Sequence, residues 1–230
     1  MGFSLANGVT AYPGWSYGSE DQPDSMIDWT TGAQPQRFPL SPNGQALGWN
    51  FGNGFVRYFV ARDATYDPLH FSPLDFTDRI RQLSTLLDST DPDLSAFLAH
   101  GGKLILKAHG ADFAISPVEV IDYYKSIVAK MGQARSESFV RLYVTPGVGH
   151  GGKGLTSSGA PVPNTIDLIG VLDDWADKGT MPGPLVQSAQ ETQAPFKTIS
   201  SRPMCRYPFY PRYIGKGDPN LASSFTCVGQ

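Results

Sequence analysis

The most regular alternation of apolar and polar positions in the chain predicts two strands joined by a helix. Short apolar runs at 104–106 and 139–144 have the length and composition of buried strands. Between them, residues 116–119 form a capping box with proline at the first helical position, and Gly132 is suited to a left-handed cap at the helix end. The apolar positions of the helix recur at steps of three and four and share one face: Val118, Ile121, Tyr124, Ile127, Val128 and Met131.

An acid and a histidine follow these two predicted strands. Asp112 comes after the first strand and His150 after the second. Because strand–helix–strand units are almost always right-handed and parallel, both loops are expected at one edge of the sheet, beyond the carboxyl ends of the strands. An acid and then a histidine in that order form the second half of a Ser-Asp-His hydrolase triad. We therefore predict Asp112 as the triad acid and His150 as the base. The alternatives are a helix-capping aspartate and a structural loop histidine.

Other residues near these loops have weaker signals. His109 shares the loop of Asp112, and we interpret it as a strand-end residue bonded to the backbone. The stretch Gly149–Gly154 spells G-x-G-x-x-G after a strand, but a loop follows it, whereas a dinucleotide fingerprint needs a helix there. No spacing of His, Cys and Asp suggests a metal site. The sequence thus predicts no cofactor in this chain.

A nucleophile is not evident. Residues 14–18 spell G-x-S-x-G around Ser16. A nucleophile elbow needs a buried strand before the serine and a helix after it, because that turn exposes the hydroxyl. The flanking sequence is polar and broken on both sides, so Ser16 is interpreted as a loop serine.

The rest of the chain has fewer regular patterns. Helices are predicted at 76–88, from the start signal at 91–93 to the glycines at 101–102, and at about 165–178. Residues 1–65 are aromatic and interrupted by Gly and Pro, which is typical of a cover packed on something else. The sequence between Met181 and the C-terminus is a Pro-rich tail. Only two or three strands can be counted, too few for a complete α/β domain. Either further strands are hidden in irregular sequence, or this chain is the C-terminal part of a larger protein, and we predict the second.

Composition and charge exclude some classes of partner. The chain has 230 residues, a net charge of −3 and a pI near 5.7, which argue against a nucleic-acid or membrane-surface role. No stretch approaches the roughly 18 apolar residues of a membrane helix. The first eight residues lack the basic start and apolar core of a signal peptide.

The two cysteines, Cys205 and Cys227, flank a segment that is rich in Pro, Tyr and Gly and cannot bury much by itself. A disulfide between them would contribute about 3 kcal/mol in the chain-entropy model and would imply an oxidising compartment. The alternative is two unrelated free thiols.

Several segments together resemble the tannase and feruloyl esterase family. They are 91–97, 101–106, 109–112 and 121–124, then 143–150 with His150, the tail segments 202–208 and 224–227, and 12–20, which resembles part of the family's lid. The resemblance implies a secreted or periplasmic α/β hydrolase that cleaves phenolic-acid esters of the feruloyl or galloyl type. It also implies that Cys205 and Cys227 close the family's C-terminal disulfide loop.

The resemblance further implies how the chain divides. The expected fold class is α/β: the C-terminal part of an α/β-hydrolase built from parallel βαβ units and preceded by an irregular lid segment. Residues 1–90 are expected to be the C-terminal part of the lid, and residues 91–230 the C-terminal half of the core with its disulfide-closed tail. A signal peptide, the nucleophilic serine and the family's calcium site would lie in the missing upstream part, because no aspartate-rich loop occurs here.

One position departs from the family pattern. In typical members a cysteine follows the catalytic histidine and bridges to a cysteine beside the serine, whereas Gly151 follows His150 here. Two hypotheses follow. The chain supplies the acid and base of a serine carboxylesterase, needs a missing N-terminal half for its nucleophile, and is inactive alone. Alternatively, it is an inactive truncated remnant or an aromatic-rich binding domain without catalysis.

Overall fold

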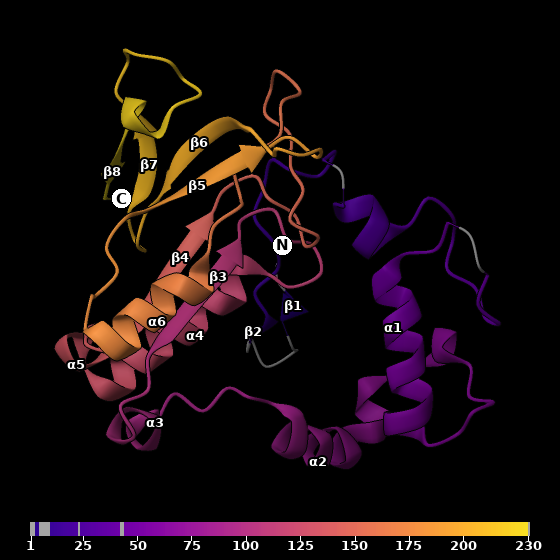
Figure 1. Ribbon diagram of the computed structural model, residues 1–230. Helices are drawn as coiled ribbons and strands as arrows, with labels where there is room; N and C mark the ends of the chain where they lie inside the picture. Colours follow the sequence, from indigo (N-terminus) through magenta and orange to yellow (C-terminus); the bar gives the residue numbers. More distant parts are fainter. Residues whose placement is uncertain (1–2, 5–9, 23, 42–43, 230) are drawn as a thin grey trace.

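The computed structural model describes residues 3–4, 10–22, 24–41 and 44–229. Its α-helices and strands follow one another along the chain in the order drawn in Figure 1: β1 (Phe3–Ser4), β2 (Thr10–Tyr12), α1 (Leu47–Phe55), α2 (Thr77–Leu87), α3 (Ser95–Ala99), β3 (Leu104–His109), α4 (Pro117–Met131), α5 (Gln133–Glu137), β4 (Val140–Thr145), α6 (Leu168–Lys178), β5 (Leu185–Gln190), β6 (Thr198–Met204), β7 (Tyr210–Tyr213) and β8 (Phe225–Val228). Short π-helical turns occupy Ile27–Thr31 and Val56–Ala61. The fold is α/β, as the sequence predicted.

The centre of the fold is the predicted strand–helix–strand unit. β3 and β4 pair in parallel, in register from Leu104 with Val140 to His109 with Thr145. α4 connects them and begins where expected, because the Ser116 hydroxyl accepts a hydrogen bond from the Val118 N–H. The prediction that Gly132 ends this helix is confirmed, but the predicted left-handed conformation of Gly132 is wrong. Gly132 has a positive φ of 85°, but its ψ of 149° is extended rather than left-handed.

Helices cover both faces of this strand pair. On one face, Tyr124 and Ile127 of α4 form the core with Phe139, Val140 and Leu142 of the second strand segment. On the other face lies Trp175 of α6, with the Arg141 guanidinium 5.0 Å from its ring centre. Alternate residues of a strand point to opposite faces, so Leu142 packs against α4 and Arg141 packs against α6.

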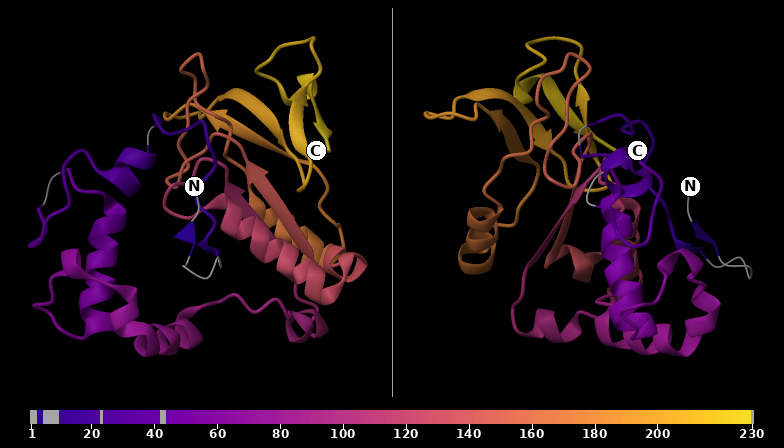
Figure 2. Two further views of the ribbon diagram at one scale, coloured as in Figure 1. Left: turned by 180° about the vertical axis from the view of Figure 1, so that it is seen from behind. Right: turned by 90° about the vertical axis from the view of Figure 1, so that its right-hand side faces the viewer.

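The segment from α1 to α2 forms an arm that lies apart from β3 and β4 (Figures 1 and 2). The sequence predicted α2 closely and missed α1. Three of the nine residues of α1 are glycines, and glycine lowers helix propensity by about 1 kcal/mol each. Gly48 allows the backbone of α1 to approach Trp29 closely, since a Cβ at this position would lie 2.6 Å from the Trp29 carbonyl oxygen. Many large apolar side chains of the arm are exposed: Leu47, Phe51, Phe55, Tyr58, Phe59, Leu69, Leu74, Leu86 and Leu87.

The C-terminal tail is more ordered than the sequence indicated. β5 pairs with β6, and β7 with β8, as antiparallel hairpins. The sequence analysis predicted no strand in this Pro-rich tail and therefore missed both hairpins. β6 and β7 each contain a proline and show weak alternation of apolar and polar residues. Both features hid these strands, because proline within a segment normally argues against a strand.

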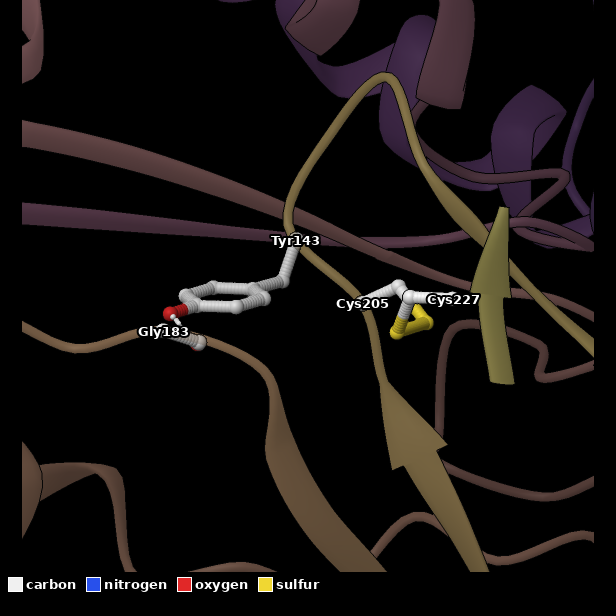
Figure 3. Close-up of a disulfide and its surroundings, with 4 residues drawn as sticks. All are labelled: Tyr143, Gly183, Cys205 and Cys227. Atoms are coloured by element: carbon white, nitrogen blue, oxygen red, sulfur yellow. Dashed lines mark hydrogen bonds between the residues drawn. A yellow bond between two sulfur atoms is a disulfide. The ribbon is translucent and has the colours of Figure 1, made fainter. Parts of the chain in front are cut away.

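The structure contains the predicted disulfide between Cys205 and Cys227, which joins the end of β6 to β8 (Figure 3). Nearby, the Tyr143 hydroxyl donates a 2.7 Å hydrogen bond to the Gly183 carbonyl (Figure 3). The Tyr207 N–H donates to the Leu142 carbonyl at 2.8 Å. These contacts attach the tail to β4.

Across the described ranges, no helix combines the length and apolar character needed to cross a membrane.

Replacing Ile127 with alanine should destabilise the chain by about 2–5 kcal/mol, because the side chain is fully buried and its removal leaves a cavity. Urea unfolding followed by circular dichroism measures the change. The matched control is Ile169→Ala at a side chain that is 84% exposed, where about 0.5 kcal/mol or less is expected. Equal effects at both positions would contradict the assigned core.

Thiol titration of the unreduced, denatured protein should find no free cysteine, since Cys205 and Cys227 are bonded to each other. After reduction the same assay should count both thiols. Detection of both before reduction would contradict the disulfide.

Candidate active site

The structure brings Asp112 and His150 into contact. The His150 Nδ1 lies 3.1 Å from the Asp112 Oδ2. The other carboxylate oxygen, Oδ1, accepts the backbone N–H groups of Ala114 and Ile115, both at 2.8 Å. These backbone bonds fix the nearly buried carboxylate, while the imidazole is partly exposed. This geometry leaves Nε2 of His150 as the ring nitrogen not used by the carboxylate.

The two alternatives for these residues can be compared with the geometry. Ser116, not Asp112, caps α4, so the helix-capping role predicted as the alternative for Asp112 is wrong. Asp112 instead orders the turn before the helix. His150 stands at the end of the β4 loop and bonds the carboxylate, as the triad hypothesis requires.

Hydrogen bonds join the loop after β3 to the loop after β4. The Gly110 N–H donates to the Thr145 carbonyl at 2.7 Å, and the Ala111 N–H donates to the Val148 carbonyl at 3.0 Å. Parallel pairing thus continues beyond the strands themselves. Asp112 and His150 consequently lie on two loops that backbone hydrogen bonds hold side by side.

His109 adds a further bond between these loops. Its Nδ1 lies 2.9 Å from the Gly149 carbonyl, so this nitrogen carries the proton and donates. Burial is the main cause that lowers the pKa of His109, and the nearby charge of Lys107 lowers it further. The backbone-bonded role predicted for His109 agrees with this contact. Burial also lowers the pKa of Lys107, whose ammonium donates to the side-chain and backbone oxygens of Asn164.

Two residues of the N-terminal segment reach the same site and were missed by the sequence analysis. The ring of Trp29 lies edge-on to the His150 imidazole, with 4.6 Å between ring centres. The Trp29 indole N–H donates to the Asp24 Oδ1 at 2.7 Å, and the Gly151 N–H donates to the Asp24 Oδ2. No local pattern marks Asp24 or Trp29, because both lie in sequence without helical or strand periodicity.

An aromatic cavity of about 360 Å³ lies beside Trp29. Its lining residues come from the N-terminal segment, α1 and the loop of Asp112: Trp15, Trp29, Thr30, Gly48, Trp49, Phe51, Phe113 and Ala114. A larger cavity of about 490 Å³ lies between α4 and the tail, near Tyr124 and Arg206, where no member of the acid–histidine pair contributes. The smaller cavity is therefore the one that belongs to this site.

The serine motif around Ser16 and the glycine run at 149–154 lack the secondary structure that their proposed functions require. Ser16 lies after β2 with no helix directly following it, and among the described residues no hydroxyl is hydrogen-bonded to His150. The glycine run is followed by a bridge between Leu155 and Pro161 rather than by a helix. Within the same described part of the chain, no cluster of three or more His, Cys, Asp or Glu side chains is arranged to hold a metal ion.

A carboxylate and a histidine beyond the carboxyl ends of neighbouring parallel strands have the arrangement of the acid–base half of a hydrolase triad. The sequence profile of the family described as tannase and feruloyl esterase matches residues 1–228. The chain belongs to this family.

Relatives and solved structures agree with this assignment. An uncharacterized esterase of Agrobacterium fabrum is 35% identical over 233 residues, covering 98% of this chain and 39% of the relative. A probable feruloyl esterase of Arthroderma benhamiae is 35% identical over 183 residues, covering 77% of this chain and 33% of the relative. The crystal structure of an esterase from Aspergillus oryzae superposes with a TM-score of 0.77 at 23% identity, covering 99% of this chain and 44% of that one. The matched region spans between a third and about two fifths of the length of these proteins, and the structural match concerns the fold.

The free energy of unfolding should decrease as the pH is lowered from 7 to 5. The pKa of His109 is depressed in the folded chain, so below about 6.5 the unfolded chain binds this proton more readily and is favoured. His109→Gln, which keeps a donor for Gly149, should flatten the pH dependence measured by urea unfolding. His100→Gln, at an exposed histidine, is the control and should keep the wild-type dependence. An unchanged slope in His109→Gln would contradict the assignment.

Proposed function

We propose that this chain supplies the acid and base of a Ser-Asp-His triad to a carboxylic ester hydrolase that acts on phenolic-acid esters of the feruloyl or galloyl type. The observation that carries the proposal is the 3.1 Å contact between Asp112 and His150 in a chain of the tannase and feruloyl esterase family. Its partner is a serine nucleophile in an N-terminal half.

In this mechanism each described residue has a defined task. The serine hydroxyl attacks the ester carbonyl, and Nε2 of His150 takes its proton as general base. The same imidazolium then returns the proton to the departing alcohol. Asp112 holds Nδ1–H and stabilises the imidazolium, while the Ala114 and Ile115 N–H groups keep its carboxylate oriented. Water then replaces the alcohol, and the same proton transfers release the acid.

Three features support a chain that works as part of a longer α/β-hydrolase. The chain spans about 39% of an esterase relative and 44% of a solved esterase. β3 has β4 as its one described strand partner, and parallel strands normally lie in larger sheets covered on both faces. The arm exposes apolar side chains such as Phe51 and Leu74, which fit a surface that packs on further protein. Residues 1–90 are then lid, and residues 91–230 the C-terminal half of the core.

The aromatic cavity beside Trp29 suits the acyl group of such esters. Trp15, Trp49 and Phe51 present flat apolar surfaces, and a phenolic ring gains from stacking on them. The ester carbonyl would then lie toward His150, which contacts Trp29 at the cavity wall. The chain itself needs no cofactor for these steps, and neither nucleic acid nor membrane is part of the proposal.

The Cys205–Cys227 disulfide fits an oxidising compartment, so we place the whole protein outside the cytoplasm, secreted or periplasmic. A signal peptide would precede the upstream half. Gly151 stands where the family usually has a cysteine after the catalytic histidine, so the loop of His150 is without that bridge. Either the partner half also lacks its cysteine, or this copy is drifting toward inactivity.

The isolated chain should not hydrolyse a feruloyl or galloyl ester, because an acid and a histidine supply no acyl acceptor. The longer protein, or the chain complemented with the nucleophile-bearing half, should do so. In that protein His150→Ala should lower kcat by several orders of magnitude, roughly 10⁴-fold or more, since triad members act as a unit. Initial rates of ester hydrolysis measure both effects.

Ser16→Ala is the control and should leave turnover nearly unchanged, because Ser16 lies in a loop, without the strand directly before it and the helix directly after it that an elbow needs. Hydrolysis by the isolated chain that disappears in Ser16→Ala would overturn the proposal. Inactivity of the complemented protein on all phenolic esters would favour the remnant or binding-domain hypothesis.

A further inference from the structure

Asp24 lies at the junction between the N-terminal segment and the loop of His150. One carboxylate oxygen accepts the Trp29 indole N–H, and the other accepts the backbone N–H of Gly151. Its own N–H donates to the Asp28 Oδ2 at 3.1 Å. A single side chain therefore fixes both an indole ring and the residue next to the histidine.

The backbone around Asp24 is shaped for this contact. Asp24 has a φ of 60°, in the left-handed region that non-glycine residues adopt rarely and that tends to persist where the surroundings determine it. A Cβ at Gly151 would lie 2.8 Å from the Asp24 Oδ2, and a Cβ at Gly149 would lie 3.0 Å from the Asp24 carbonyl oxygen. The glycines on either side of His150 thus leave the space that Asp24 occupies.

Trp29 transmits this anchoring to the imidazole. Its ring meets the His150 ring at 68°, with 4.6 Å between centres, and the indole cannot rotate freely while Asp24 holds its N–H. It also stacks on Phe51 of α1, with rings 6.3 Å apart at 11°. A chain of contacts therefore leads from the arm through Trp29 to the imidazole.

We propose that Asp24 and Trp29 are positioning residues for His150. Asp112 holds the imidazole through Nδ1, Asp24 holds the loop through Gly151, and Trp29 limits rotation of the ring. Together they fix the direction in which Nε2 points. The catalytic meaning of this arrangement rests on the proposed function, whereas the arrangement itself can be tested on the isolated chain.

Nuclear magnetic resonance of the 230-residue chain tests the contacts directly. The Trp29 indole N–H signal and the His150 ring protons are assigned with Trp29→Phe and His150→Gln. In Asp24→Asn one of the two carboxylate oxygens is replaced by an NH2 donor, so one of the two former donors loses its acceptor. We expect the Trp29 indole signal, the Gly151 amide and the His150 ring protons all to shift, and the His150 ring to sample more than one χ1 rotamer.

Matched variants separate this effect from general disturbance. Asp21→Asn changes an exposed acid three residues away, so it should not move the His150 signals. Gly151→Ala should reproduce the effect of Asp24→Asn, because the added methyl displaces the carboxylate. Unchanged amide shifts of β3 and β4 establish that each variant is folded. His150 signals that stay at their wild-type positions in folded Asp24→Asn and Trp29→Phe would overturn the proposal.

A second readout uses the complemented esterase. Asp24→Asn should lower kcat on the order of tenfold to a hundredfold through misalignment of the base, with a smaller change in KM. Asp21→Asn should retain wild-type kcat. An equal kcat in Asp24→Asn and wild type would overturn the positioning role. If no esterase activity is found at all, the proposed function fails, while the resonance measurements still decide the contacts.

Discussion

The parallel pairing of β3 with β4 is the constraint on which the rest of the structure depends. It aligns the two strands so that both carboxyl ends stop at the same level, with His109 opposite Thr145. The backbone bonds from Gly110 and Ala111 then extend the pairing into the loops. Without this register, Asp112 and His150, which are 38 residues apart in the sequence, would not lie within hydrogen-bonding distance.

The two sides of this strand pair have different tasks. The face toward α4 is apolar and forms the buried core with Tyr124 and Ile127. The opposite face carries Arg141, Lys107 and His109, and each of these side chains donates a hydrogen bond to a backbone or side-chain oxygen. Burial without a partner would be costly for such groups, so these bonds preserve the fold and also orient the loops of the site.

The strand–helix–strand unit was predictable because each of its signals is local. Apolar runs mark β3 and β4, and Ser116 with Pro117 marks the start of α4. The pairing of Asp112 with His150 then followed from topology alone. Asp24 could not be found in this way, since its contact with Gly151 joins residues 127 positions apart and depends on how the N-terminal segment folds back. α1 and the hairpins of the tail were missed because glycines and prolines oppose their intrinsic propensities.

The exposed apolar surface of the arm also determines the behaviour of the chain in solution. Phe51, Leu74 and Leu86 are each more than two thirds exposed, and the net charge of −3 provides little repulsion between copies. Surfaces of this kind associate as concentration rises, and added salt weakens the remaining repulsion. Dilute, low-salt conditions away from the pI therefore suit the purified chain, and its colloidal stability depends on the arm rather than on the strand pair.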